Sequence, residues 1–594
     1  MQEYLAPLDD MNFVIQEHLG FDALTQLSGA EDVSSDLVAS ILSEAGKLAR
    51  DVLSPLNRSG DQTGLQINED AQVTTPSGFA DAYRQYADGG WGSLQFDPEY
   101  GGRGLPFSLA IPVQEMWHAA NMAWGLCPLL TQGAIEAIEA NASDALKRQY
   151  LPEMISGNWT GTMNLTEPQS GSDMATLRTR AEPCGDHYKI FGQKIFITWG
   201  EHDMAENIIH LVLARLPDAP PGVKGISLFL VPKFLPSTDL TQSTRNDCHV
   251  MSLEHKIGVH ASPTCVMSYG DNGGAVGFLI SQEHRGLACM FSMMNNARLT
   301  VGLQGVAISE RAYQLARDYA LERSQGVAPG RTAIGPIIRH PDVRRMLLSM
   351  RSLTEASRAL TYTACFNVDH RNKHPDADVR AFHHARSALL TPIVKGWCTE
   401  VAQEVTSLGV QIHGGMGFIE ESGAGQYFRD ARILPIYEGT NGIQAADLAE
   451  RKTRGDSGRA MDLLIQEMRD VIHCAQGLGE PIISLADAFA ASVVALNSAK
   501  DILLTKSEID INFGPATSSN YLMLAGTVCG GWQMLIAAIA ANTQLNNGAK
   551  NSFYNSKILV AQFYMANILP RYLSYAAAIN AGSAAVMALP ENQF

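Results

Sequence analysis

The sequence predicts a mainly α-helical protein with a small β domain in its middle. Long stretches before residue 160 and after residue 286 space their apolar residues three and four apart, as helices with a buried face require. Between them, over about residues 164–281, short β-branched and alternating runs are bounded by Pro, Gly, Asp and Asn. At 594 residues the chain is too long for one hydrophobic core, so we expect several domains.

The individual elements follow from the same patterns. Residues 37–53 and 109–138 have helical spacing on either side of a Gly- and Pro-rich loop, so the first domain is expected to be all helical. Helical spacing returns from residue 286 to 454, and after a polar break at 453–459 the last part is helical and poor in charge. Four alternating runs predict the strands of a barrel or a sandwich, at 187–199, 207–216, 225–234 and 274–282.

Composition and charge exclude several functions. Lys and Arg number 44 against 61 Asp and Glu, a net charge of −17 without a long basic run, so nucleic acid is not an expected partner. The nine cysteines include no C-x-x-C pair, and His383 and His384 lack metal-ligand spacing, so neither disulfides nor a metal are indicated. The N-terminal segment MQEYLAPLDDMNF resembles neither a secretory signal nor a transit peptide, so we expect a cytoplasmic protein.

One stretch is apolar enough to raise the question of a membrane. No charged residue lies between Asp510 and Lys550, a length that could span a bilayer. However, no basic anchor precedes the apolar part, and Gly530, Gly531 and Gln533 interrupt its centre. We therefore expect a buried pair of helices, with membrane or partner contact as the alternative.

Two segments at the start of the expected β domain could bind a cofactor. No G-x-G-x-x-G links a strand to a helix and no G-x-x-x-x-G-K-[ST] occurs, so Rossmann-type and P-loop sites lose their main support. The segment MNLTEPQSGSD (163–173) is either a plain turn or a loop of N–H and hydroxyl donors that suits a flavin edge and a phosphate. In GQKIFITWGEHD (192–203), Phe196 and Thr198 share one strand face, where they either pack in a core or flank a planar ring.

A third segment, ARILPIYEGTNGIQAADLAER (431–451), places a carboxylate at the tip of a loop. Pro435 and Gly439 form the loop, and Thr440 or Asn441 can cap the helix that follows. Glu438 is left among apolar neighbours, where a carboxylate loses hydration and becomes a stronger base. The alternative is an ordinary solvated loop acid.

Taken together, these three segments resemble the acyl-CoA dehydrogenase family, whose pattern is TEPxxGSD, then G-x-K-x-[FW]-I-T, then YEGT. ALERSQG (320–326) and QIHGGMGF (411–418) also match, in the family's order and at compatible spacing. The resemblance covers roughly residues 35–450 and implies a helical domain at 1–160, a middle β domain, a barrel, at 161–284 and a four-helix FAD and acyl-CoA domain at 285–452. The additional helical domain at 453–594 is similar to that of larger members, including very-long-chain-type and bacterial 3-methylmercaptopropionyl-CoA dehydrogenases, and implies a homodimer.

The resemblance also assigns roles to residues. It makes Glu438 the catalytic base and FAD the cofactor. The implied cofactor-binding residues are Met163, Leu165, Thr166, Ser172, Phe196, Ile197, Thr198, Arg323, Gln411, Gly414, Gly415, Thr440 and Asn441. The implied substrate-binding residues are Ser172, Asn295, Arg298, Tyr437 and Gly439.

The implied reaction is the FAD-dependent α,β-dehydrogenation of an acyl-CoA thioester to trans-2-enoyl-CoA, of the fatty acid β-oxidation type. The implied electron acceptor is an electron-transfer flavoprotein. The alternatives are a 3-methylmercaptopropionyl-CoA dehydrogenase, an acyl-CoA oxidase that passes electrons to oxygen, and a non-catalytic acyl-CoA-binding or partner-binding relative. The acid at position 438 argues against the last of these.

Overall fold

The computed structural model describes residues 3–236 and 244–594, and the chain divides into two compact units. Unit 1 consists of the N-terminal segment up to Glu44, the short stretch Pro106–Glu115 and the long stretch Arg298–Phe594. Unit 2 consists of Ala45–Leu105 and Met116–Ala297, and it contains the β domain. Three helices run from one unit into the other: α3 (Ser35–Leu48), α6 (Phe107–Ala120) and α9 (Gly286–Glu322).

The helical part of unit 2 is interrupted in sequence by a small hairpin. Its main helices are α4 (Ser54–Thr63), α5 (Phe79–Asp88), α7 (Met122–Asn141) and α8 (Asp144–Ser156). The expectation that this region is all helical was wrong, because β1 (Gln66–Ile67) and β2 (Val73–Thr74) pair in antiparallel fashion. The side-chain oxygen of Asn68 accepts hydrogen bonds from the N–H groups of Asp70 and Gln72, which stabilises the turn between the two strands.

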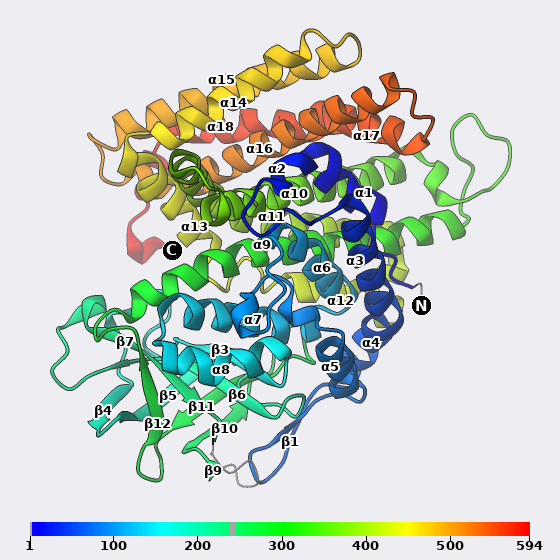
Figure 1. Cartoon of the computed structure of the whole chain (residues 1–594). Coiled ribbons are helices and arrows are strands. Elements are labelled where there is room, and N and C mark those ends of the chain that lie inside the picture. Colours follow the sequence, from blue (N-terminus) through cyan, green and yellow to red (C-terminus); the bar gives the residue numbers. More distant parts are fainter. Residues whose placement is uncertain (1–2, 237–243) are drawn as a thin grey trace. The chain divides into compact units, whose positions relative to one another are not determined.

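The β domain of unit 2 is an eight-stranded sheet that closes on itself in part (Figure 1). The strand order is β10-β11-β5-β12-β7-β6-β3, and β4 pairs with both β5 and β6, so five strands form a ring. The predicted barrel and all four predicted strands are present. The strands are β3 (Trp159–Asn164), β4 (Arg180–Cys184), β5 (His187–Thr198), β6 (Asn207–Arg215), β7 (Ile226–Pro232), β10 (Cys248–Leu253), β11 (Thr264–Tyr269) and β12 (Ala275–Ile280), with a separate pair β8 (Phe234–Leu235) and β9 (Thr244–Arg245).

Sequence patterns missed β3, which positions the predicted flavin loop. Its sequence, WTGTMN, has no apolar alternation, because the strand is buried on both faces: it runs parallel to β6 and contacts α7 and α8 (Figure 1). Gly161 allows the close approach of α7, since a Cβ added there would lie 2.5 Å from the Cβ of Ala134.

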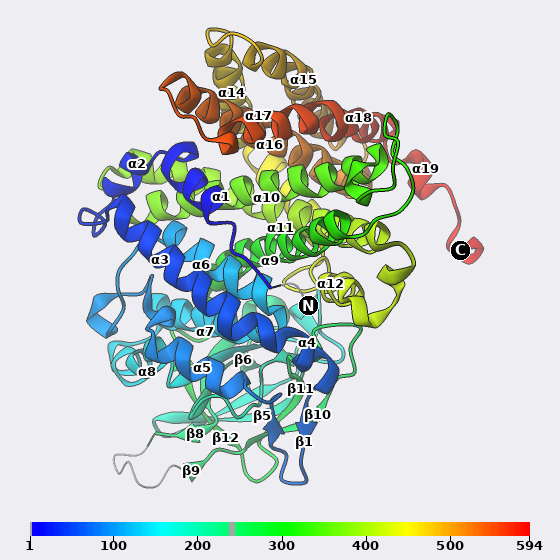
Figure 2. The same ribbon diagram turned by 90° about the vertical axis from the view of Figure 1, so that its right-hand side faces the viewer.

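Unit 1 is a stack of long helices (Figure 2). Helices α10 and α11 form an antiparallel pair, and α16 packs against both. Besides the C-terminal part of α9, the helices are α1 (Leu8–Phe13), α2 (Phe21–Thr25), α3 (Ser35–Leu48, which continues into unit 2), α10 (Pro341–Lys373), α11 (Ala377–His413), α12 (Ala424–Ala431), α13 (Asn441–Ala446), α14 (Arg459–Ala475), α15 (Ile482–Lys506), α16 (Phe513–Asn546), α17 (Ser552–Phe563), α18 (Tyr572–Ala581) and α19 (Ala584–Met587).

The charge-poor stretch is one 34-residue helix, α16, and not the expected pair of helices. Gly526 and Gly530 do not break it, because they make room for neighbours: a Cβ on Gly526 would lie 2.2 Å from Trp397 Cγ, and one on Gly530 would lie 2.3 Å from the Tyr564 hydroxyl. Both α15 and α16 are long and apolar enough to cross a membrane, but 83% of the most apolar window of α16 is buried inside the protein, against 44% for α15. Helix α16 therefore lacks charged residues because it is buried in the protein core.

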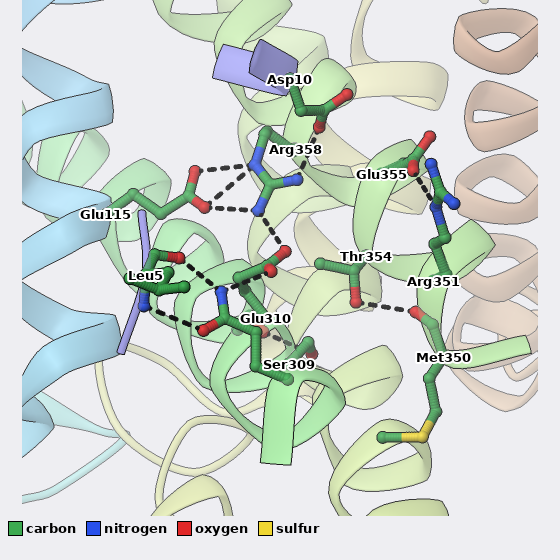
Figure 3. Close-up of polar contacts among 12 residues, drawn as sticks. Leu5, Asp10, Glu115, Ser309, Glu310, Met350, Arg351, Thr354, Glu355 and Arg358 are labelled. Atoms are coloured by element: carbon green, nitrogen blue, oxygen red, sulfur yellow. Dashed lines mark hydrogen bonds and ion pairs between the residues drawn. The ribbon is translucent and has the colours of Figure 1, made fainter. Parts of the chain in front are cut away.

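A buried ion cluster in unit 1 joins α10 to three distant segments of the chain (Figure 3), and α17 contributes a lysine to it. The guanidinium of Arg358 on α10 donates to Glu115 at 2.7 Å, Glu310 at 2.8 Å and Asp10 at 2.7 Å. The ammonium of Lys557 on α17 also donates to Asp10, at 2.6 Å. These bonds hold the N-terminal segment, α6 and α9 against α10.

Candidate functional site

The predicted base lies on a strained loop between α12 and α13. The N–H of Asn441 donates to the carbonyl of Pro435 at 2.9 Å, which closes the loop. The hydroxyl of Thr440 caps α13 by accepting from the N–H of Ile443, so Thr440 is the N-cap. Glu438 at the tip has φ 55° and Gly439 has φ 83°. A left-handed conformation at Glu costs about 1–3 kcal/mol and persists only where surrounding contacts hold it.

Those contacts come from buried side chains that hold the backbone of the loop. Arg298 on α9 donates from Nε to the Glu438 carbonyl at 3.4 Å, and Gln444 on α13 donates to the carbonyls of Glu438 and Gly439, both at 3.3 Å. Arg298 is 4% exposed and lies 3.8 Å from Asp447. The structure thus brings the predicted Arg298 to the predicted base, but against its backbone.

The Glu438 side chain is left with its acceptor oxygens open. Within the described part of the chain, neither its carboxylate nor its N–H forms a hydrogen bond. Burial raises the pKa of Glu438, and the cations of Arg298 and Lys395 oppose that rise. Glu438 therefore offers two groups to a ligand: a carboxylate that can accept a proton, and a backbone N–H that can donate a hydrogen bond. The neighbouring Tyr437 is committed elsewhere, because its hydroxyl donates to Gln304.

Four of the predicted cofactor-binding residues lie where α9 and α11 end. The ring of Tyr319 stacks on His413 with centroids 4.4 Å apart, which brings the two helix ends together. Arg323, Gln411, Gly414 and Gly415 are all exposed in this region of unit 1. No atom lies within 4 Å of a Cβ added to either glycine, so their backbone is open to a ligand.

Asn441 is engaged with α11 instead. Its side chain accepts from Lys395 at 3.0 Å and donates to Glu400 at 2.8 Å. Asn295, a predicted substrate residue, is partly exposed on α9, in unit 2.

In unit 2, the predicted flavin residues of two segments are brought together at the end of β5. The N–H of Ile195 donates to the carbonyl of Thr166 at 2.9 Å, and the hydroxyl of Thr162 donates to the carbonyl of Thr198 at 2.7 Å. Met163 and Ile197 are buried, Leu165 and Thr166 are partly exposed, and Ser172 is exposed.

The exposure of Phe196 tests whether this surface suits a flavin. Its ring is 58% exposed and its backbone is left-handed, with φ 60°. An aromatic ring turned out of a strand at a conformational cost, beside the partly exposed Thr198, fits a planar cofactor ring and not a core position. The residues present therefore fit FAD.

A buried ion pair that sequence reasoning missed holds the flavin loop. Lys194 on β5 donates to Glu167 at 2.9 Å and to the carbonyl of Leu165 at 3.0 Å. Glu167 also accepts from the N–H of Arg178 at 2.7 Å and from the hydroxyl of Thr179 at 2.6 Å. Burial opposes the charge of Glu167, but these partners lower its pKa to about 2, while burial lowers the pKa of Lys194 to about 8. The sequence feature that could have indicated this ion pair is Lys194 itself, a lysine inside an otherwise apolar strand pattern.

Comparison with known families covers almost the whole chain. Models described as "Acyl-CoA dehydrogenase" N-terminal, middle and C-terminal domains match residues 40–158, 162–271 and 284–453. A fourth, described as "Acetyl-CoA dehydrogenase C-terminal like", matches residues 464–590.

Individual relatives agree with these matches. The chain is 46% identical over 573 residues to the 3-methylmercaptopropionyl-CoA dehydrogenase of Ruegeria pomeroyi, which covers 95% of this chain and 96% of the relative. It is 35% identical to a butyryl-CoA dehydrogenase of Syntrophomonas wolfei, over 100% of this chain and 99% of the relative. The solved structure of an acyl-CoA dehydrogenase complexed with FAD from Bacillus anthracis has the same fold, with a TM-score of 0.73 at 21% identity over 96% of this chain and 91% of that chain. The chain therefore belongs to the acyl-CoA dehydrogenase family of FAD-dependent enzymes.

Proposed function

We propose that this acyl-CoA dehydrogenase converts a saturated acyl-CoA to a trans-2-enoyl-CoA, with Glu438 as the base, in a reaction of the fatty acid β-oxidation type. One observation carries the assignment of the base. Glu438 is held in a left-handed conformation by contacts to its backbone, while its carboxylate makes no hydrogen bond in the described part of the chain. A strained, positioned and unbonded carboxylate is what proton abstraction requires.

The residues of the chain divide the work as follows. The Glu438 carboxylate accepts the proton from the carbon next to the thioester. The thioester oxygen gathers negative charge as that proton leaves, and the open N–H of Glu438 is available to donate to it. Arg298 and Gln444 keep the loop backbone in place while this happens. When bound, FAD supplies the acceptor for the hydride that leaves the β-carbon.

The full-length relatives support a proposal for the substrate and the acceptor. The Ruegeria relative is named for 3-methylmercaptopropionyl-CoA and the Syntrophomonas relative for butyryl-CoA, both short acyl groups. We propose a short-chain thioester, with 3-methylmercaptopropionyl-CoA as the first candidate and an electron-transfer flavoprotein as the acceptor. We also propose a homodimer, which would cover Phe418, 91% exposed beside Gly414 and Gly415.

A panel of acyl-CoA thioesters tests the reaction, the cofactor and the substrate together. Anaerobic mixing with a substrate should bleach the flavin absorbance of the purified protein, fastest with a short thioester. Reoxidation that is fast with electron-transfer flavoprotein and slow with oxygen would distinguish a dehydrogenase from an oxidase. A protein that contains FAD but is bleached by no thioester would refute the proposed reaction.

The Glu438→Gln variant tests the base. It should still bind acyl-CoA and shift the flavin spectrum, while flavin reduction slows by about 10²-fold to 10⁴-fold, the usual contribution of a positioned general base. Glu206→Gln, which changes an exposed acid in unit 2, is the matched control and should reduce at the normal rate. Near-normal reduction of Glu438→Gln would remove this residue from the mechanism.

A further inference from the structure

Lys395 is a buried cation beside the loop that carries Glu438. It lies in the middle of α11 and is 0% exposed. Its ammonium donates to the side-chain oxygen of Asn441 at 3.0 Å, the residue that closes the base loop. The same amide group donates to Thr399 at 3.0 Å and to Glu400 at 2.8 Å. The lysine therefore belongs to a polar junction between α11 and the loop, within unit 1.

The charges around Lys395 come from several elements. The base loop contributes Glu438, α11 contributes Glu400, and α9 contributes Arg298, which in turn faces Asp447 and Arg451 beyond α13. Helix α16 contributes no charge, because no charged residue lies between positions 510 and 550. It meets this part of α11 with an apolar contact, where a Cβ on Gly396 would lie 2.4 Å from Leu522.

A neutral donor would have satisfied Asn441 at lower cost. Burying an ammonium away from water is unfavourable unless an opposite charge compensates it. Burial lowers the pKa of Lys395 to about 7, and the negative charges of Glu438 and then Glu400 oppose that shift. The Glu400 carboxylate is already occupied by Asn441. The side chain of Glu438 makes no hydrogen bond in the described residues and benefits most from a nearby cation.

We propose that Lys395 is a positioning residue whose positive charge keeps the Glu438 carboxylate ionised and ready to accept the α-proton. This inference rests on the proposed role of Glu438 as the base. An opposite charge nearby favours the ionised form of a carboxylate, so the lysine extends the base's activity toward lower pH. Arg298 has the larger of the two effects on the pKa of Glu438 and Lys395 adds to it, while the guanidinium of Arg298 is directed at the carbonyl of Glu438 and toward Asp447.

The test is the pH dependence of flavin reduction in uncharged variants. Rapid mixing with the best substrate gives the second-order rate constant, whose pH profile reports the base in the free enzyme. Lys395→Met and Lys395→Gln should raise the apparent pKa of the base by about one pH unit or more. The rate constant should therefore fall about tenfold or more below the wild-type pKa and approach the wild-type value at high pH. Lys395→Arg should restore the low-pH activity.

Two further variants separate charge from anchoring. Asn441→Ala removes the hydrogen bond but leaves the ammonium, so its pKa should stay that of the wild type even if its rate is lower at every pH. Lys500→Met removes a buried lysine that pairs with Asp462 in the C-terminal helices, and it should leave the profile unchanged. FAD content and circular dichroism confirm that each variant is folded.

The outcomes distinguish this inference from the proposed function. A wild-type profile in Lys395→Met or Lys395→Gln would overturn it, and so would an equal pKa shift in Asn441→Ala, which would assign the effect to loop anchoring. A low-pH defect in Lys395→Arg equal to that of Lys395→Met would do the same. Failure of the wild-type protein to reduce its flavin with any thioester would instead refute the proposed reaction.

Discussion

Replacing Arg358 by Met should destabilise the contacts between the N-terminal segment and α10 in a pH-dependent way. Arg358 is 1% exposed and compensates three carboxylates (Figure 3). Without it, Asp10 keeps Lys557 at 2.6 Å and Glu310 keeps the amide of Gln314 at 2.9 Å. Among the residues that the structure describes, Glu115, which is 0% exposed, keeps only the hydroxyl of Tyr362 at 2.7 Å. The cost should therefore fall mainly on Glu115.

The magnitude follows from the protonation of that carboxyl. Burial raises the pKa of Glu115 even with Arg358 present, and removing Arg358 takes away the largest charge that opposes this rise, so full protonation of Glu115 in the folded variant sets the upper limit of the cost. Holding a glutamic acid protonated at pH 7, when its unfolded-state pKa is about 4.3, costs about 3.7 kcal/mol. This agrees with the roughly 3–5 kcal/mol lost when one partner of a buried ion pair is removed. Because the raised pKa makes the folded state bind the extra proton, the cost shrinks as pH falls, to about 1.6 kcal/mol at pH 5.5.

Hydrogen exchange of α10 peptides measures this local free energy in a multidomain protein. After correction for intrinsic exchange, the loss of protection in Arg358→Met should be about 500-fold at about pH 7 and about 15-fold at about pH 5.5. The double variant Glu115→Gln with Arg358→Met should recover part of the loss, because no buried carboxylate is then left with a single partner. Arg84→Met, in the exposed pair with Asp81, is the control. A loss of protection that is equal at both pH values would refute this reasoning.

Three further predictions concern the rest of the chain. Lys194→Met should lower the FAD content, because it removes the side chain that bonds to Glu167 and to the carbonyl of Leu165. The measurement is flavin absorbance relative to protein absorbance, and Lys189→Met on the same strand is the control that should retain FAD. Equal FAD content in both variants would contradict the anchoring role. Gly526→Val should destabilise the protein by about 1–3 kcal/mol or more and lower its thermal midpoint, because the new side chain would overlap Trp397. Gly477→Ala, where a side chain has room, is the control. An unchanged midpoint in Gly526→Val would be inconsistent with this packing. Truncation after Arg454 should cause aggregation or a changed oligomer, measured by light scattering, because it uncovers the apolar faces of α10 and α11 that α16 covers. A soluble truncated chain with an unchanged oligomeric state would show that the region is dispensable.

The sequence predicted best those features that depend on local pattern. The strands β5, β6, β7 and β12 alternate or are β-branched, and they form where expected. The Glu438 loop was predicted because Pro435, Gly439 and the Thr440 cap lie within a few residues of each other. Helix α16 was misread as a pair because two adjacent glycines indicate a break, and only the packing of Trp397 and Tyr564 explains why a continuous helix needs small residues there.

Contacts between distant segments could not be predicted in this way. Arg298 is 140 residues from Glu438, and Lys395 is 46 residues from its hydrogen-bond partner Asn441. The sequence pattern around a single Arg or Lys in a helix does not indicate which distant residue it contacts. The family resemblance assigned a role to Arg298 but none to Lys395 or Lys194, because these residues act on loops and not on the ligand.

Residues with unfavourable backbone conformations mark the positions at which these loops place functional side chains. Phe196, Trp199 and Glu438 have φ between 55° and 60°, which non-glycine residues adopt only at a cost. Each has a buried polar contact close by: Lys194 lies two residues before Phe196, the indole N–H of Trp199 itself donates to the carbonyl of Ala123 at 3.2 Å, and Arg298 donates to the carbonyl of Glu438. Because these contacts supply the energy that holds the strained residues, changing one of them should displace a functional side chain without removing it. A variant of Lys194 should therefore lose FAD-dependent activity even though every residue assigned to contact FAD is still present in the chain.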